Sequence, residues 1–198
     1  LLGLKESFAG LGVGIGIYLL IRYKINYKIA IATILISIIW GYLALKIIIP
    51  HYSNGIYLYG NPQFPSGPLE FLKAFFLPFM KSKTMFYSFA TFGFLPLFNL
   101  AMIPSIFENF LERFVLSPFS SRWDLGMHYN VPLSPLMFIS ALEVFKMLEK
   151  KFNSKKIIIY LSLLILFSTA FLHRFTLRGP LGLFYNPDFY KQNQYSKY

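Results

Sequence analysis

Lys5 and Glu6 are adjacent charged residues at the start of a long apolar stretch. A lysine ammonium at a membrane boundary can hold a phosphate group, and a neighbouring carboxylate can orient a reacting group or take up its proton. A structural role fits equally, because lysine reaches toward the membrane surface and a carboxylate is favourable at a helix N-terminus. We therefore treat Lys5 as a candidate substrate-binding residue and Glu6 as a candidate catalytic residue.

Two His-Tyr pairs, His51-Tyr52 and His128-Tyr129, lie next to the ends of apolar stretches. Histidine titrates near neutral pH and can bind a lipid head group or carry a proton. His128 is a candidate catalytic residue, and His51 and Tyr129 are candidates for substrate binding. An interfacial belt of aromatic side chains explains both pairs as well. The chain has three histidines, widely spaced and without a pattern such as His-x-x-x-His, so we expect no metal site and no other cofactor.

Further charged residues that could take part in chemistry lie in the tripeptide Arg122-Trp123-Asp124 and at Glu143. Arginine is a natural phosphate ligand, so Arg122 is a candidate for substrate binding and Asp124 for a catalytic base. A surface turn explains this tripeptide at least as well. Glu143 interrupts an apolar stretch, where a carboxylate is functional by default. Because Lys146 follows three residues later, a local Glu143–Lys146 pair is the preferred interpretation.

Glycine recurs at every second position from Gly10 to Gly16. A dinucleotide loop of the form G-x-G-x-x-G would need a third glycine where this chain has isoleucine, and no phosphate-loop lysine follows. The spacings Gly10-x-x-x-Gly14 and Gly12-x-x-x-Gly16 instead predict close packing between helices in a membrane.

The apolar stretch Ile29–Ile49 determines the expected fold class. Its one charge, Lys46, lies near its end, and a helix of this length, at about 1.5 Å per residue, crosses a hydrocarbon core about 30 Å thick. The chain is 56% hydrophobic and 14% charged, with a mean hydropathy of +0.52. We predict an all-α, polytopic transmembrane bundle of about six membrane segments. The expected spans are residues 8–21, 29–49, about 85–98, about 100–115, 131–148 and 157–172, with an interfacial helix over 69–80.

The region 85–116 can form either two short spans turning at Pro96–Asn99 or one span and a soluble helix. The choice determines how many membrane crossings separate the basic clusters on either side of it, and so the orientation of the chain in the membrane. Cytoplasmic loops collect Lys and Arg. The two clearest basic clusters, around Arg22–Lys28 and Lys146–Lys156, require an even number of crossings between them if both are cytoplasmic. We therefore predict the hairpin. Its second leg would be a poor lipid-facing helix, buried in protein or interfacial, because it carries Glu108, Asn109, Glu112 and Arg113.

This topology predicts a multi-pass plasma-membrane protein whose candidate residues lie on the outer face. The extracytoplasmic segments are expected at residues 1–7, 50–83, 117–130 and 173–198. Residues 1–172 form the expected transmembrane domain, which we interpret as a fragment of a longer protein because it starts within an apolar stretch, and 173–198 form a tail. Membrane lipid is the expected partner. Nucleic acid is not, despite the net charge of +11, because the basic residues lie between apolar runs and form no continuous stripe.

The order of short motifs resembles a known family. Lys5-Glu6 precedes a glycine-containing span, Lys46–His51 ends the second span, Gly93–Leu97 follows, and His128–Leu133 opens another span. In this order most of residues 1–172 is similar to the uncharacterised predicted membrane proteins grouped as domain of unknown function family 2079. The first motif of that family is usually Lys-Glu-Asp. Ser7 stands at the Asp position here, which leaves Lys5 and Glu6 to carry any role of the motif.

The family is in turn similar to type C glycosyltransferases, which are multi-span enzymes that take a sugar from a polyprenyl-phosphate donor on the outer membrane face. The resemblance implies that Lys5 holds the donor phosphate and that Arg122 or His128 assists. The acidic base of such enzymes would precede Leu1. The alternative hypothesis is a non-enzymatic membrane protein, either a transporter subunit or a scaffold. A transporter should show polar residues at mid-membrane and broken helices in two related halves, and only Glu108, Glu112 and the break at Pro96 point that way.

Overall fold

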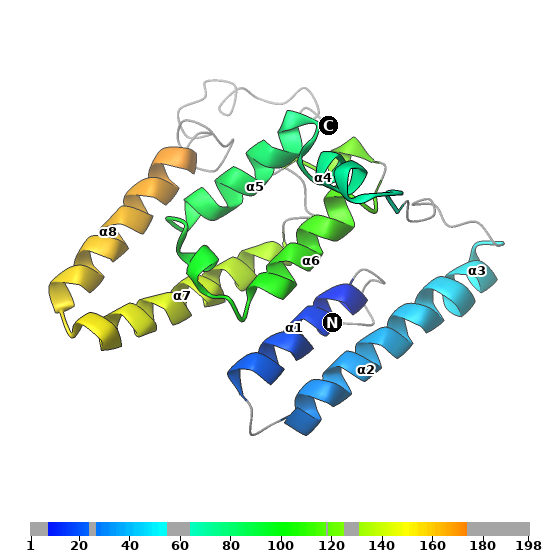
Figure 1. Cartoon of the computed structure of the whole chain (residues 1–198), viewed down its shortest axis with the longest axis horizontal. Coiled ribbons are helices and arrows are strands. Elements are labelled where there is room, and N and C mark those ends of the chain that lie inside the picture. Colours follow the sequence, from blue (N-terminus) through cyan, green and yellow to red (C-terminus); the bar gives the residue numbers. More distant parts are fainter. Residues whose placement is uncertain (1–7, 24–26, 55–63, 118, 125–130, 174–198) are drawn as a thin grey trace, which may run out of the picture.

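The computed structural model describes residues 8–23, 27–54, 64–117, 119–124 and 131–173, and these residues form helices joined by short turns (Figure 1). The predicted all-α class is confirmed. In chain order the elements are α1 (Phe8–Arg22), α2 (Tyr27–Leu43), the π-helical turn η3 (Ala44–Ile48), α3 (Ile49–Tyr52), α4 (Pro68–Phe76), α5 (Phe79–Thr91), the 3₁₀ helix η4 (Leu95–Phe98), α6 (Ile103–Phe114), the 3₁₀ helix η5 (Ser120–Arg122), α7 (Leu133–Phe152) and α8 (Lys155–Phe171).

The longest helix is continuous from Tyr27 to Tyr52 and contains α2, η3 and α3. With 26 residues it is, within the described ranges, the one helix long and apolar enough to cross a membrane. Most of its isoleucine side chains are exposed, which suits contact with lipid tails. The other expected spans are helical as well, but they are shorter or carry more charge, so composition and length single out this helix alone.

Glycines let α1 pack closely against two neighbours, as the sequence predicts. A Cβ atom on Gly14 would lie 2.7 Å from the Cα atom of Ser105 on α6. A Cβ atom on Gly16 would lie 2.4 Å from Cγ1 of Ile34 on α2. Both distances are too short for a real Cβ, so each glycine permits a backbone approach that alanine would block. The packing of α1 between α2 and α6 is visible in Figure 1.

The segment 68–114 differs in its boundaries from the prediction. The interfacial helix expected over 69–80 ends at Phe76, and α5 starts at Phe79, ahead of the expected start near residue 85. Pro78 causes the break, because proline cannot donate a backbone hydrogen bond and disfavours helical backbone at the residue before it. The two helices of the predicted hairpin are present as α5 and α6, and their crossing of the membrane stays a prediction. Gly93 and Phe94, both with positive φ, turn the chain after α5.

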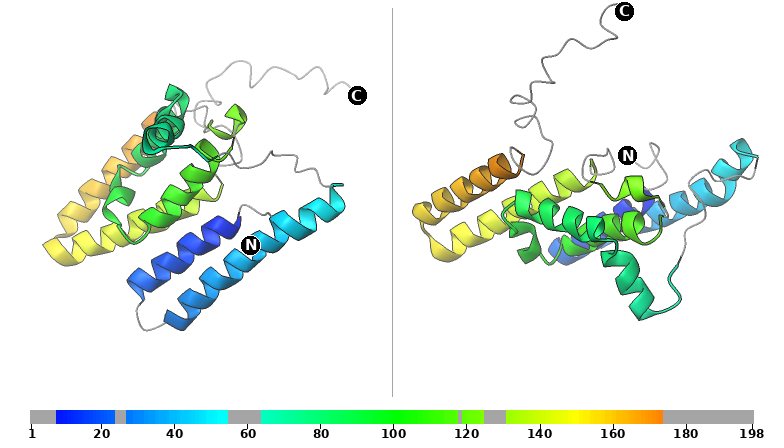
Figure 2. Two further views of the ribbon diagram at one scale, coloured as in Figure 1. Left: turned by 45° about the vertical axis from the view of Figure 1, so that its right-hand side comes forward. Right: turned by 90° about the horizontal axis from the view of Figure 1, so that it is seen from above.

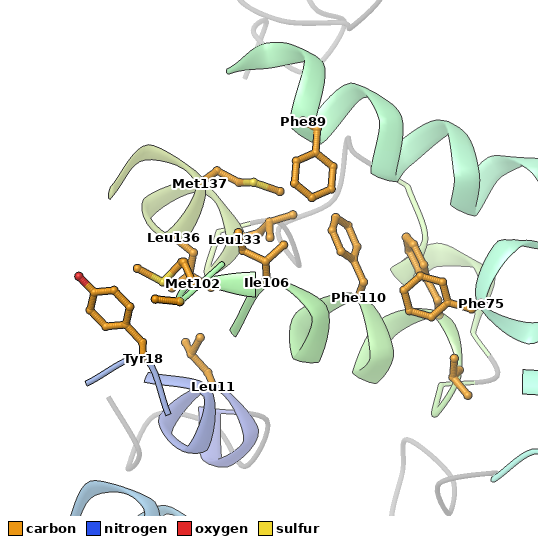
Figure 3. Close-up of a cluster of buried hydrophobic side chains, with 13 residues drawn as sticks. Leu11, Tyr18, Phe75, Phe89, Met102, Ile106, Phe110, Leu133, Leu136 and Met137 are labelled. Atoms are coloured by element: carbon orange, nitrogen blue, oxygen red, sulfur yellow. The ribbon is translucent and has the colours of Figure 1, made fainter. Parts of the chain in front are cut away.

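The hydrophobic core lies where α6 meets its neighbours (Figure 3). Met102, Ile106 and Phe110 follow each other at intervals of four residues, so they line one face of α6 and its entry turn. Figure 3 shows this face pointing toward side chains from α1, α4, α5 and α7. These partners include Leu11, Tyr18, Phe75, Phe89, Leu133, Leu136 and Met137.

The helices alternate in direction, so their termini form two ends of the bundle (Figures 1 and 2). In Figure 1, α1, α5 and α7 run downward, whereas α2–α3, α6 and α8 run upward. We call the upper end, where α5 begins and α6 ends, the turn end. We call the lower end, where α1 and α7 end and α2 and α8 begin, the basic end. Its residues include Arg22, Lys28, Lys150, Lys151, Lys155 and Lys156.

Candidate functional site at the Arg122–Asp124 turn

Residues 122–124, which we call the Arg122–Asp124 turn, follow α6 at the turn end of the bundle. Buried side chains hold each of the turn's three successive backbone carbonyls. Arg113 donates from Nε to the carbonyl of Arg122 at 2.9 Å and from Nη2 to the carbonyl of Asp124 at 3.4 Å. Thr84 Oγ1 on α5 donates to the carbonyl of Trp123 at 2.6 Å. The turn is therefore fixed to both legs of the hairpin.

Arg113 is the main anchor of this turn. Its side chain is only 1% exposed, which is rare for arginine and costly unless the guanidinium is hydrogen-bonded. The planar guanidinium presents several donors in fixed directions, so one side chain can hold two carbonyls of the same turn. The arrangement positions the side chains of the turn before any ligand arrives, which is what a binding or catalytic site needs.

The Arg122 side chain continues the network toward α6. Its Nη2 atom forms an ion pair with Glu112, the residue that precedes Arg113 on the helix. Arg122 is 8% exposed, so the surface-turn interpretation is wrong for this residue. Asp124 is exposed. The sequence did not indicate the burial of Arg122, and the role of the two residues in a site stays a prediction.

Lys81 joins the same cluster from the start of α5. Its Nζ atom donates to the carbonyls of Ala74 and Phe114, both at 2.7 Å, and lies 4.0 Å from the centre of the Trp123 ring. These carbonyls belong to the last turns of α4 and α6, where helix carbonyls have no partner within the helix and a cation is favourable. The lysine is 4% exposed. It thus fastens two helix ends and the aromatic ring of the turn to one another.

The structure brings together only part of the predicted site. His51 lies at the exposed end of α3, where its ring packs edge-on against Tyr52 at 5.0 Å between ring centres. Among the described residues it has no hydrogen bond to the Arg122–Asp124 turn. The other predicted site residues lie outside the described residues, and they are Lys5, Glu6, His128 and Tyr129.

Lys81, Thr84 and Arg113 are the anchoring residues that sequence reasoning did not identify as part of the site. A signal for Arg113 was present, since Ser105, Asn109 and Arg113 recur at intervals of four and must share one face of α6. Of the two alternatives for this leg, buried in protein or interfacial, these three residues fit the first, because each is less than 9% exposed. No local pattern singles out Thr84 or Lys81, because their partners are backbone carbonyls far away in the chain.

Glu143 has different partners from those expected. Tyr18 on α1 donates a hydrogen bond to its Oε1 atom at 2.5 Å, and Asn99 after η4 donates to Oε2 at 2.9 Å. Arg22 Nε lies 3.6 Å from Oε1. The predicted pair with Lys146 is therefore wrong, because the glutamate faces the hairpin connection and α1 while Lys146 is exposed. Glu143 therefore links α7 to α1 and to the hairpin connection.

The described residues contain no group of three or more His, Asp or Glu side chains that could hold a metal ion. No curated protein and no solved structure matches the chain at a significant level. The model of one protein family, described as "Predicted membrane protein (DUF2079)", matches residues 1–181. This match covers almost the whole chain and agrees with the motif resemblance and the long apolar helix. The chain therefore belongs to the DUF2079 family of predicted membrane proteins.

Proposed function

We propose that this chain is part of a glycosyltransferase-like membrane enzyme that uses a polyprenyl-phosphate-linked sugar at the outer membrane face. The observation that carries the proposal is the fixation of three successive carbonyls of the Arg122–Asp124 turn by Arg113 and Thr84. A turn that served only as a connection would not need a buried arginine. A turn that presents an arginine and a carboxylate to a reacting phosphate and hydroxyl does need fixed geometry.

The distribution of basic residues supports an outward-facing turn end. The basic end of the bundle collects Arg22 and Lys28 from one helical pair and Lys150, Lys151 and Lys155 from another. The positive-inside tendency places such an end in the cytoplasm. The opposite end, with the Arg122–Asp124 turn, α4 and the end of α3, then faces outward.

The lengths of α5 and α6 support a re-entrant hairpin in place of two full spans. The helices have 13 and 12 residues, so at about 1.5 Å per residue each is about 20 Å long or less, short of a core about 30 Å thick. In Figure 1 the basic ends of α1, α2, α7 and α8 extend beyond the hairpin connection. The hairpin would enter from the outer side and return to it, with Asn99 and Glu143 at depth. Leu95, Pro96 and Asn99 of this connection are buried, which shields part of its irregular backbone.

The proposed chemistry is a displacement at the anomeric carbon of the sugar. A hydroxyl oxygen of the acceptor attacks this carbon, the bond from carbon to phosphate oxygen breaks, and the polyprenyl phosphate leaves with the bonding electrons. Asp124 takes the proton of the acceptor hydroxyl. Arg122 binds the phosphate, which replaces part of the pairing of Arg122 with Glu112. Lys5, three residues before the start of α1, supplies a second cation for the phosphate.

Exposed apolar residues next to the turn suit a donor with a lipid tail. Lys81 ties the last turn of α4 to the site, and the surface of α4 and its connection to α5 is apolar and exposed. Such a surface at the outer interface can lie in the head-group region and contact a polyprenyl chain. The residues that form it are Leu69, Leu72, Phe76, Leu77, Phe79 and Met80.

Sugar transfer by the full-length protein in proteoliposomes tests this proposal, with a labelled sugar on a polyprenyl-phosphate donor. Arg122→Ala should lower the initial rate by at least about 100-fold, and Arg122→Lys should keep part of it because the charge remains. Lys150→Ala, at the exposed basic end, is the matched control and should leave the rate unchanged. Thermal unfolding of each variant separates loss of rate from loss of fold. A wild-type protein that transfers no sugar, or an Arg122→Ala variant with an unchanged rate, would favour the scaffold or transporter alternative.

A further inference from the structure

Glu108 on α6 lies directly against Gly10 of α1. A Cβ atom on Gly10 would lie 1.8 Å from the Oε1 atom of Glu108, so the carboxyl group occupies the space that the missing side chain leaves. The glutamate is partly buried there and lies in the second leg of the hairpin, about one and a half turns from the end of α6. The contact between α1 and α6 is thus built around a carboxyl group.

Glu108 has neither a hydrogen bond nor an ion pair with any described residue, although it is partly buried. The comparable glutamates do have partners. Glu112, one turn further along α6, pairs with Arg122. Glu143 receives hydrogen bonds from Tyr18 and Asn99. The lack of a partner therefore distinguishes Glu108 from Glu112 and Glu143.

The surroundings of Glu108 offer polar atoms but no cation in the described part of the chain. Ser105, one turn before Glu108, lies on the same side of α6, and Asn109 follows Glu108 in the sequence. They are 0% and 5% exposed, and Ser105 Oγ and Asn109 Oδ1 have no hydrogen-bond partners among the described residues. The nearest titratable group on α6 is Glu112, a like charge. The remaining charged and titratable groups of α6 and of the helices packed on it have other partners or lie in exposed positions. They are Arg113 on α6, Tyr18 and Arg22 on α1, Glu70 and Lys73 on α4, Lys81, Lys83 and Tyr87 on α5, and Glu143, Lys146, Glu149, Lys150 and Lys151 on α7.

An ionised carboxylate in this position would be unfavourable. A charge removed from water is strongly destabilising unless a partner compensates it. The group can avoid this cost by keeping its proton, and the protonated form can also donate a hydrogen bond to an unpaired oxygen such as Ser105 Oγ. The burial of Glu108, its lack of a partner and its two unpaired neighbours therefore all favour the protonated carboxyl group.

We propose that Glu108 is a proton-binding site within the membrane, protonated while α1 packs against α6. When this contact opens, the O–H bond breaks, the proton passes to water at the turn end, and the carboxylate remains with access to solvent. Protonation thereby favours the closed α1–α6 contact. This inference does not depend on the proposed sugar transfer, since it concerns the contact of α6 with α1 and a different ligand.

Infrared spectroscopy of the full-length protein in proteoliposomes at neutral pH tests this site without any activity assay. The difference between wild type and Glu108→Gln should contain the C=O stretch of a protonated carboxyl group. The matched difference for Glu149→Gln, an exposed glutamate on α7, should contain carboxylate bands instead. The protonated band should decrease as the pH is raised. A Glu108 difference spectrum with carboxylate bands alone at neutral pH would overturn the proposal.

Two further measurements test whether the ligand is a proton and whether the contact with α1 keeps Glu108 protonated. Sodium added at constant pH should leave the protonated band unchanged, and a loss of the band would assign the site to a metal cation instead of a proton. Gly10→Ala should move the carboxyl group into solvent, because the new methyl group would occupy its position. The protonated band should then disappear at neutral pH, and a band of unchanged intensity would contradict the role of the α1 contact.

Discussion

Tyr18 on α1 donates a 2.5 Å hydrogen bond to Glu143 on α7, across 125 positions of the sequence. Asn99, in the connection of the hairpin, donates to the other oxygen of the same carboxylate. One glutamate thus determines how α1, the hairpin connection and α7 meet. In a membrane the hydrophobic effect does not drive helices together, so such polar contacts and close packing fix their relative positions.

The Tyr18–Glu143 contact should show a measurable coupling. We expect Tyr18→Phe and Glu143→Gln each to destabilise the protein, and the double variant to lose less than the sum of the two. A coupling of about 1 kcal/mol is expected, as for other interhelical hydrogen bonds in membranes. Unfolding of the protein in detergent micelles or bicelles measures it. Tyr27→Phe, an exposed tyrosine at the start of α2, is the control, and strict additivity of the two changes would contradict the contact.

Two glycines on the same face of α1 should respond differently to alanine. At Gly14 the added Cβ meets the backbone of Ser105 at 2.7 Å, so α1 and α6 must separate. At Gly10 it meets only the end of the flexible Glu108 side chain, which can turn away. We expect Gly14→Ala to cost about 1–3 kcal/mol of unfolding free energy and Gly10→Ala less than about 1 kcal/mol. Equal costs in an unfolding titration would show that the helices do not meet as described.

Lys81 should contribute far more to stability than the neighbouring Lys83. Lys81→Met leaves the carbonyls of Ala74 and Phe114 without their donor, so we expect a loss of about 2 kcal/mol or more. Lys83 is exposed, and Lys83→Met should change the unfolding free energy by no more than about 0.5 kcal/mol. Thermal unfolding in the same membrane mimetic compares the two. A Lys81→Met variant as stable as wild type would remove the lysine from the set of anchors.

Glu70, in the first turn of α4, should titrate at unusually low pH. Hydrogen bonds from the hydroxyl and the backbone N–H of Ser66 lower the pKa of its carboxyl group. The folded state therefore binds a proton less readily than the unfolded chain. The resulting stabilisation is present above the unfolded pKa and is lost as pH falls through the folded pKa.

An NMR titration of the Glu70 side chain in nanodiscs measures this effect directly. Ser66→Ala removes the hydroxyl donor, so the pKa of Glu70 should rise toward its ordinary value. The backbone N–H of residue 66 remains and should preserve part of the shift. Ser82→Ala, whose hydroxyl bonds the carbonyl of Phe76, should leave the titration unchanged. The hydrogen-bonding account predicts no effect from this control, and an equal shift in both variants would argue against it.

The sequence was sufficient to predict the helical class, the long apolar helix and the glycine contacts, because each follows from a local pattern. The helix pair α5 and α6 was predicted from the distribution of basic residues along the chain, and its crossing of the membrane stays a prediction. Periodicity and composition depend on neighbouring residues. The stretch Ile29–Ile49 and the spacing of Gly10 and Gly14 can therefore be interpreted without knowledge of distant parts of the chain. Boundaries were less accurate. The expected helix over 69–80 ignored Pro78, whose effect on the backbone is stronger than the amphipathic pattern around it.

The partners of the polar residues could not be predicted in the same way. Lys146 is the nearest cation to Glu143 in sequence, yet Tyr18 and Asn99 bind this glutamate from other elements. Likewise Arg113 and Thr84 bind backbone carbonyls, which every residue has and no motif marks. Such contacts depend on the packing of distant segments, and only the three-dimensional structure gives them.

The most direct test of the proposed site compares the rate of sugar transfer by two variants of the full-length protein. One variant lacks a carboxylate at the turn end of the bundle, and the other lacks a carboxylate near the basic end. Asp124→Asn removes the proposed base at the Arg122–Asp124 turn, and Glu149→Gln neutralises an exposed carboxylate near the basic end. We predict that Asp124→Asn lowers the initial rate by about 100-fold or more, as expected for loss of a general base, while Glu149→Gln retains the wild-type rate. Equal rates for wild type, Asp124→Asn and Glu149→Gln would contradict the assignment of the site to this turn.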